Sequence, residues 1–169
     1  MKKRMAILLG IFAACVFLGC GTKSPLEGKW TSTFTVRNGL ERPEKAGEIV
    51  LYLNFERETE YVFHSGSFSK KTSQRLSSVE KVGDYELPKT EEELAKKLDS
   101  ELETRGSYSV FGGNVNFFTE TVVLPDGSEL DVADSPDISS LIGETEYHEE
   151  FRLSGDSLFL GGVEFKKAQ

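Results

Sequence analysis

The segment WTSTFTVR, residues 30–37, carries its large apolar side chains only at alternate positions. Trp30, Ser32, Phe34 and Val36 occupy one set of alternate positions, and three threonines and an arginine occupy the other. Successive side chains of a strand point to opposite faces, so a period of two predicts a strand with one face in a core and one in solvent. The segment therefore indicates a β-sheet protein and marks its first strand.

Similar runs follow along most of the chain. They are residues 48–55, 60–63, 106–111, 114–124, 145–153, 157–160 and 163–167, and a weaker strand is expected near residues 76–87. Turn signals separate several runs, among them Asn38-Gly39, Gly112-Gly113 and Ser154-Gly155-Asp156. About eight antiparallel strands in chain order predict an all-β, up-and-down barrel, which leaves no exposed edge strand. A β-sandwich of the same strands is the alternative.

One amphipathic helix is expected between the strands. Thr90 and Glu93 have the spacing of a capping box, and leucine recurs every four residues from Leu94 to Leu102. These signals predict a helix over residues 91–103.

The first residues have the layout of a secretory signal. Three basic residues at positions 2–4 precede an uncharged apolar run of 14 residues, Met5 to Leu18, and the small residue Gly19. At about 1.5 Å per residue, a helix of this run is shorter than the ~30 Å hydrocarbon core of a bilayer. We therefore expect residues 1–19 to be cleaved as a signal peptide.

The sequence Phe17-Leu18-Gly19-Cys20 resembles the lipobox of bacterial lipoproteins, in which the cysteine is lipidated and becomes the new N-terminus. The resemblance implies that Cys20 carries fatty acyl chains such as palmitate, that residues 20–27 form a lipidated tether, and that residues 28–169 form one domain. Cleavage removes Cys15 and leaves Cys20 without a disulfide partner. Gly21, where some lipoproteins have an aspartate that retains them at the inner membrane, implies the outer membrane of the bacterial cell envelope, on its periplasmic face or at the cell surface. An ordinary cleaved signal with an incidental cysteine is the alternative.

Charge and motif content restrict the function. Removing the three basic residues of the signal leaves 17 of the 20 Lys and Arg against 28 Asp and Glu, a net charge of −11 rather than −8. Such a chain repels phosphate backbones, and the small basic cluster Lys70-Lys71 does not reverse this, so we expect no nucleic-acid partner. Neither His64 nor His148 lies in a G-x-S-x-G or H-E-x-x-H context, and no Walker-type loop is present, so the sequence predicts a non-enzymatic protein.

Gly28-Lys29-Trp30 is similar to the Gly-x-Trp motif of lipocalins, in which the tryptophan closes the floor of the barrel. The segment 26–30, the hairpin at Gly112-Gly113 and the last strands around residues 154–156 are similar to bacterial lipocalin-like lipoproteins. The resemblance implies that Arg152 or a C-terminal lysine covers Trp30. It also implies a small hydrophobic ligand in the barrel mouth and no cofactor. Gly83-Asp84-Tyr85 departs from the Thr-Asp-Tyr motif of the family.

The inward-facing residues are bulky, and an eight-stranded barrel is just wide enough to be filled by side chains or to hold one small ligand. Both a packed core and a ligand pocket are compatible with them. The candidate ligand-lining residues are Trp30, Phe34, Leu53, Phe55, Tyr61, Phe63, Tyr108, Phe117, Tyr147 and Phe151.

Two groups of residues resemble metal ligands without the spacing of a known site. Alternation places Glu146, His148 and Glu150 on one strand face, opposite Tyr147 and Phe151, but one histidine makes a poor zinc site. An acidic loop carries hard oxygen ligands without the spacing of an EF-hand: Asp126, Glu129, Asp131, Asp134 and Asp137. We interpret both groups as solvated surface and expect no metal.

The sequence therefore predicts a lipid-anchored cell-envelope protein that binds a small hydrophobic ligand in a β-barrel. The alternative is a structural or interaction lipoprotein, in which the barrel is a scaffold and the outer surface docks an envelope or host protein whose identity is unknown.

Overall fold

The computed structural model of the chain describes residues 24–42, 45–83 and 89–168. Cys20 and the expected signal peptide lie outside these residues, as do Asp84 and Tyr85. Within the described part of the chain, no helix has the length and apolar character needed to cross a membrane.

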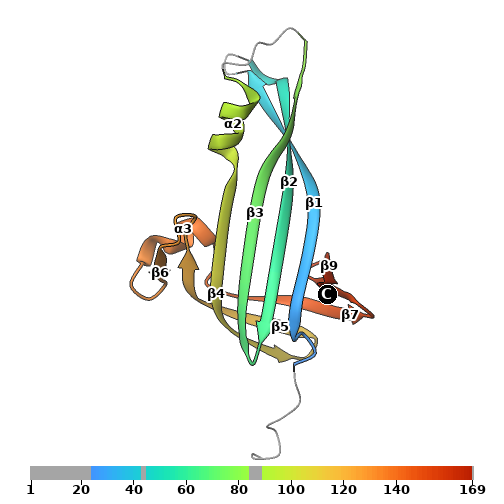
Figure 1. Cartoon of the computed structure of the whole chain (residues 1–169), viewed down its shortest axis with the longest axis vertical. Helices are drawn as coiled ribbons and strands as arrows, with labels where there is room; N and C mark the ends of the chain where they lie inside the picture. The colour runs from blue at the N-terminus through green and yellow to red at the C-terminus, as the bar shows by residue number, and fades with distance from the viewer. Residues whose placement is uncertain (1–23, 43–44, 84–88, 169) are drawn as a thin grey trace, which may run out of the picture.

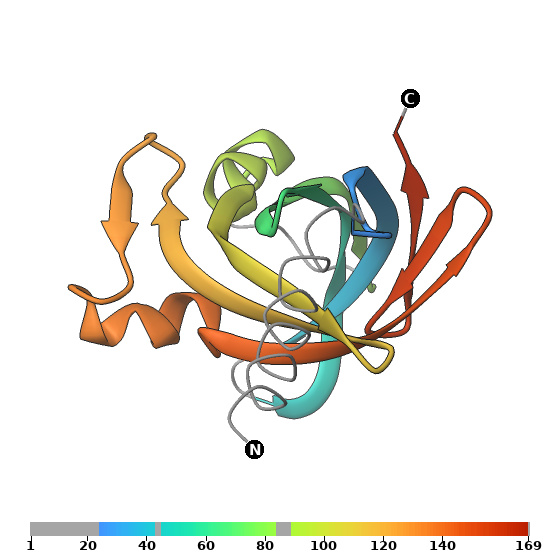
Figure 2. The same cartoon turned by 90° about the horizontal axis from the view of Figure 1, so that it is seen from below.

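The described residues form a closed barrel of eight antiparallel strands (Figures 1 and 2). The strands of the barrel are β1 (Gly28–Arg42), β2 (Lys45–His64), β3 (Ser67–Lys81), β4 (Ser100–Phe111), β5 (Asn114–Val123), β7 (Glu146–Ser154), β8 (Ser157–Leu160) and β9 (Val163–Lys167). Each strand pairs with the next in chain order, β5 pairs with both β4 and β7, and β9 pairs back to β1. This order confirms the predicted up-and-down barrel and excludes the sandwich.

Three short elements lie between β5 and β7. β6 (Glu129–Asp131) pairs with the C-terminal end of β5, and η1 (Pro136–Ile138) and α3 (Ser139–Ile142) follow β6 in the chain. They lie at one side of the barrel in the view along its axis (Figure 2).

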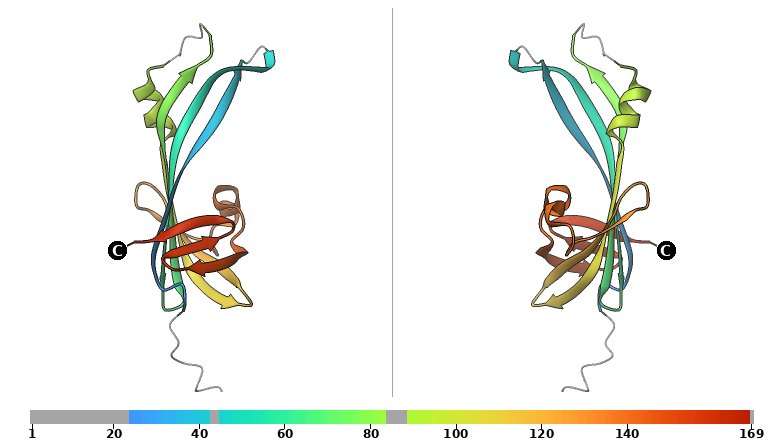
Figure 3. Two further views of the ribbon diagram at one scale, coloured as in Figure 1. Left: turned by 90° about the vertical axis from the view of Figure 1, so that its right-hand side faces the viewer. Right: turned by 90° about the vertical axis from the view of Figure 1, so that its left-hand side faces the viewer.

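The barrel is closed at one end and open at the other because its strands differ in length. β9 pairs only with Trp30 and Thr31 of β1, whereas β1 and β2 stay paired from Gly28 to Arg42. The first three strands therefore rise as a tall sheet beyond the short strands β7, β8 and β9 (Figure 3).

The closed end is filled by an aromatic core. Its buried members are Leu26, Trp30, Tyr61, Phe63, Phe68, Tyr108, Val115, Phe117, Leu158, Leu160 and Phe165. The indole Nε1 of Trp30 donates a hydrogen bond to the carbonyl oxygen of Leu26 at 2.7 Å, and Lys167 Nζ lies 5.3 Å from the Trp30 ring centroid. Trp30 thus lies at the barrel floor under a C-terminal lysine, as the lipocalin resemblance implies, while Arg152 stacks on Phe159 instead.

A second, smaller cluster lies on the tall sheet. Val50, Leu51, Leu53 and Phe55 of β2 are buried there, and Leu98 of α2 (Glu91–Leu98) packs against them. The predicted capping box is present, because Thr90 Oγ1 accepts from Glu93 N and the Glu93 carboxylate accepts from Thr90 N, each at 3.2 Å.

The helix is shorter than expected. It ends at Leu98, and Leu102 lies in β4, where it pairs with Thr72. A spacing of four residues places side chains on one face of a helix and also on one face of a strand, so the leucine pattern could not locate the boundary. At the end of the helix, the Asp99 carboxylate accepts a hydrogen bond from the backbone N–H of Leu76 at 2.8 Å.

Three strand predictions were also wrong. The runs at residues 48–55 and 60–63 belong to one strand, β2. The first strand does not turn at Asn38-Gly39 but continues to Arg42, because Asn38 and Gly39 pair with Leu53 and Tyr52 of β2. The strand expected near residues 76–87 is the second half of β3, which runs unbroken from Ser67 to Lys81. Its Ser-rich and Lys-rich first half was not predicted as a strand, because its inner face is polar and gives no apolar alternation.

Candidate functional site: a polar cavity in the open half of the barrel

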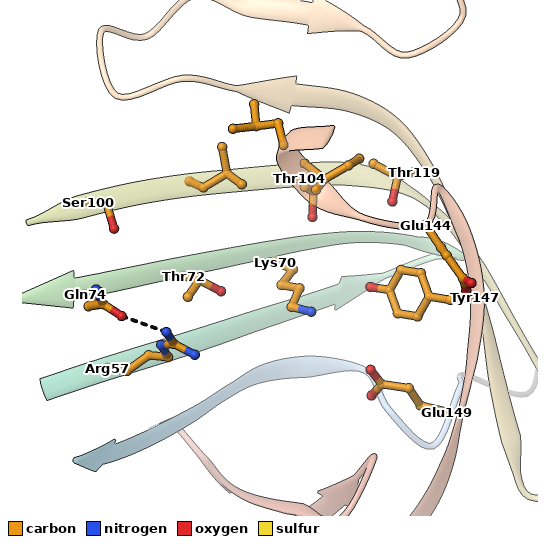
Figure 4. A pocket seen from close by; sticks show the side chains of 13 residues that line it. Arg57, Lys70, Thr72, Gln74, Ser100, Thr104, Thr119, Glu144, Tyr147 and Glu149 are labelled. Carbon is orange, nitrogen blue, oxygen red and sulfur yellow. Dashed lines mark hydrogen bonds between the residues drawn. The ribbon is translucent and has the colours of Figure 1, made fainter. Parts of the chain in front are cut away.

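A cavity of about 660 Å³ lies between the aromatic core and the second cluster. Strands β2 to β5, α3 and β7 form its wall (Figure 4). The apolar lining residues are Leu102, Leu141 and Ile142, and the polar ones are Arg57, Lys70, Thr72, Gln74, Ser100, Thr104, Thr119, Glu144, Tyr147 and Glu149.

The alternation of β3 explains why the cavity is polar. Phe68 lies in the aromatic core and Leu76 packs on the second cluster, so every second residue between them faces the barrel interior. These inward residues are Lys70, Thr72 and Gln74. The interior is therefore apolar at both ends of β3 and polar in between.

Lys70 is the central charged group of the cavity. Its Nζ lies 5.4 Å from the ring centroid of Tyr61 and 5.6 Å from that of Tyr147, so its charge rests against two aromatic faces. Burial lowers the pKa of Lys70, and the negative charge of Glu149 partly opposes this effect. Within the described residues, no hydrogen bond or salt bridge joins the Lys70 amine to another side chain.

The acidic groups near Lys70 are shifted towards their neutral forms. Burial raises the pKa of Glu149, and the positive charge of Lys70 partly offsets the shift. Burial also raises the pKa of Tyr147 to about 12 and raises the pKa of Tyr61 further. The cavity floor is thus poorly hydrated, and a charge placed there interacts strongly with its neighbours.

Arg57 supplies a second cation from the neighbouring strand β2. Its Nη2 donates to Gln74 Oε1 at 2.6 Å, a neutral partner. Its Nε is buried and has no acceptor among the described residues. The centroid of the Phe34 ring lies 6.0 Å from the Cζ of Arg57.

The structure separates the predicted ligand-lining residues. Of the ten, Tyr147 lines this cavity. Trp30, Tyr61, Phe63, Tyr108 and Phe117 belong to the aromatic core, and Phe151 packs against it. Leu53 and Phe55 lie in the second cluster, while Phe34 is 40% exposed beside Arg57. The core and cavity thus coexist in one barrel, one above the other.

Sequence reasoning missed the charged residues of the cavity. Lys70 was grouped with Lys71 as a surface cluster, although alternation from Phe68 places Lys70 inward and Lys71 outward. Glu149 lies two residues from both Tyr147 and Phe151, so it shares their face of strand β7. The strict period of two, applied to charged residues as well as to aromatic ones, was the signal that could have found them.

The candidate metal ligands do not converge. Glu146, His148 and Glu150 are exposed on the outer face of β7, as predicted. In the acidic loop, Asp126 accepts from Ser128, and Glu129 pairs with Arg105 at 2.8 Å. Among the residues that the structure describes, no group of three or more His, Cys, Asp and Glu is arranged to hold a metal ion.

Comparison with known proteins identifies no relative: no family model, no curated protein and no solved structure matches the chain. The resemblances to lipoproteins and lipocalins therefore rest on the sequence motifs and on the barrel itself.

Proposed function

We propose that this protein is a lipid-anchored, non-enzymatic component of the bacterial cell envelope that binds a small molecule in the open half of its barrel. The cavity of about 660 Å³ is the observation that carries the proposal. Its volume lies within the range of about 300–1,000 Å³ typical of small-molecule sites.

The lining suits a ligand with an apolar part. Leu102, Leu141, Ile142 and the Tyr147 ring offer apolar contact, which supports the hydrophobic ligand expected from the sequence. The polar side chains between them would orient such a ligand, because a few placed polar groups fix orientation in pockets of this kind.

The proposed anchor also gives the barrel an orientation. Leu26 is fully buried at the closed end, and Cys20 precedes it by six residues, which span at most about 20 Å. A lipid on Cys20 would therefore hold the closed end near the bilayer, with the cavity directed away from the membrane. A Cys20→Ala variant tests the anchor: we expect it to leave the membrane fraction, and a variant that stays membrane-bound with normal processing would remove this part of the proposal.

Ligand binding is tested by filling the cavity. A Thr72→Phe and Thr104→Phe double variant places two rings in the cavity wall. We expect it to lose any small molecule detected on the native protein by native mass spectrometry, and to bind the neutral dye N-phenyl-1-naphthylamine about tenfold more weakly. The matched control is Thr33→Phe with Thr35→Phe, at exposed positions of β1. Unchanged dye binding by the cavity variant would place the site elsewhere and remove the proposal.

A second candidate function is the docking of an envelope or host protein. Phe111 favours it, because this side chain is 82% exposed beside the Gly112-Gly113 turn between β4 and β5. Crosslinking in cells with the native protein and with Phe111→Ser tests it. An identical set of crosslinked neighbours for the two proteins would count against docking through this side chain.

A further inference from the structure

The cavity contains two cations that form no salt bridge with a carboxylate among the described residues. Lys70 and Arg57 line it from adjacent strands (Figure 4). Lys71, the next residue along β3, pairs with Glu101 at 2.8 Å on the outer face. Within the described part of the chain, no carboxylate oxygen forms a salt bridge with Lys70 or Arg57. In a chain of net charge −8, two inward cations without such a partner call for a physical explanation.

Both cations have hydrogen-bond donors to spare. A guanidinium has five N–H groups and an ammonium has three. Arg57 donates to Gln74 through Nη2, but its buried Nε has no acceptor among the described residues. Lys70 has aromatic faces beside it and no oxygen acceptor within this part of the chain. Buried donors are nearly always paired in folded proteins, so a ligand oxygen in the cavity would pair the buried Nε of Arg57, and the partly buried amine of Lys70 lines the same cavity.

We propose that the ligand of this cavity is a small organic anion, whose carboxylate or phosphate oxygens accept hydrogen bonds from Lys70 and Arg57. This inference rests on the function proposed above and adds the chemical class of the ligand. Hydrogen bonds between such oxygens and charged donors are about twice as strong as neutral ones, and Arg presents a fork that matches both groups.

The neighbouring residues complete a site for the anionic group. Thr72 is the next inward residue of β3 after Lys70, and Thr104 pairs with Lys70 across the β3–β4 ladder. Both threonines line the same cavity and carry hydroxyl donors. Leu102, next inward on β4, and Leu141 of α3 provide the apolar surface for the rest of the ligand.

The acidic residues of the cavity leave room for this anion. Glu149 lies beside Tyr147, and Lys70 lies between them and Arg57 (Figure 4). The anion is therefore placed on the Arg57 side of Lys70. Glu144 also lines the cavity, after α3. Burial raises the pKa of Glu149, and the positive charge of Lys70 partly offsets this shift.

Two dyes of the same skeleton test the proposal on the purified full chain. 8-Anilinonaphthalene-1-sulfonate carries an anionic group that N-phenyl-1-naphthylamine lacks. Lys70→Met and Arg57→Met should each weaken binding of the anionic dye about tenfold and change that of the neutral dye less than twofold. The matched controls are Lys71→Met and Arg75→Met, at exposed neighbouring positions of β3, and they should leave both affinities unchanged.

Competition then defines the anionic group. Octanoate or octyl phosphate should displace the anionic dye at concentrations about tenfold lower than 1-octanol does. Equal potency of 1-octanol would overturn the inference, and so would displacement by inorganic phosphate as effective as that by octyl phosphate, because the apolar part would then contribute nothing. If the neutral dye binds and Lys70→Met affects both dyes alike, the inference fails while the proposed function stands. If neither dye binds the native chain, both fail.

Discussion

The closed and open halves of the barrel are built from the same strands but have opposite interiors. At the closed end, Phe117 contacts the rings of Tyr61, Phe63, Phe68 and Tyr147, with centroids 4.9–6.2 Å apart. In the open half, the inward positions of β3 between the two apolar clusters, Lys70, Thr72 and Gln74, are polar or charged and line a cavity. Alternation decides which residues face inward, whereas the identity of those residues decides whether the interior is packed or open. The two halves should therefore respond differently to substitution.

The largest effect is expected in the aromatic core. Phe117→Ala removes a side chain that is fully buried and should lower the free energy of unfolding by about 3–5 kcal/mol, because it leaves a large cavity at the closed end. Urea unfolding followed by circular dichroism measures this. The control is Phe111→Ala, at an 82% exposed position, which should stay within about 0.5 kcal/mol of the native protein. A loss below about 1 kcal/mol for Phe117→Ala would mean that the closed end is not the stabilising half.

The boundary between the halves gives the next largest effect. Gly106 lies on β4 between Thr104, which lines the cavity, and Tyr108, in the aromatic core. A Cβ at this position would lie 1.9 Å from the backbone oxygen of Phe118, so Gly106→Ala must displace the neighbouring strand. We expect a loss of about 2–3 kcal/mol in thermal or urea unfolding.

Gly39→Ala is the matched control for this change. Its new Cβ would approach the end of the Ile49 side chain, 3.2 Å away, and that side chain can move. Its cost should be below about 1 kcal/mol. Equal losses for the two variants would show that the backbone contact at Gly106 has no special weight.

Substitution of a charged cavity residue should raise stability rather than lower it. Lys70→Met removes a partly buried cation that has no salt bridge within the described residues, and we expect the unliganded protein to gain about 1 kcal/mol in urea unfolding. The same variant should bind the anionic dye more weakly, so stability and binding would change in opposite senses. Lys71→Met, on the exposed face, should leave the stability close to that of the native protein. A marked loss of stability for Lys70→Met would mean that this lysine is part of the packed core.

The sequence was sufficient for the barrel and insufficient for the cavity, for one physical reason. Trp30, Tyr61 and Phe117 are apolar residues at alternate positions, so their burial follows from the hydrophobic effect and the strand period. Lys70 and Arg57 are charged, and charged side chains are usually solvated, so only their register with apolar neighbours reveals that they face inward. The end of α2 was likewise hidden, because Leu102 fits both a helical and a strand repeat.

The smallest effect we expect is a pH dependence of the free energy of unfolding, caused by the cavity residue Glu149. Burial raises the pKa of this carboxyl above its ordinary value of 4.5, so between 4.5 and the pKa in the folded state the folded protein binds more protons than the unfolded chain. The free energy of unfolding must therefore fall as the pH rises through this window. Below pH 4.5 the carboxyl is neutral in both states and its contribution to stability is fully present. Because Glu149 is partly exposed and Lys70 lies nearby, the change should be about 0.5 kcal/mol or less. Urea unfolding of the native protein and of Glu149→Gln across this range should give curves that diverge with rising pH, with the glutamine variant the more stable. The control is Glu150→Gln, on the outer face, whose stability curve should follow that of the native protein. If the Glu149→Gln curve also runs parallel to the native curve, the interior around Glu149 is as hydrated as the surface.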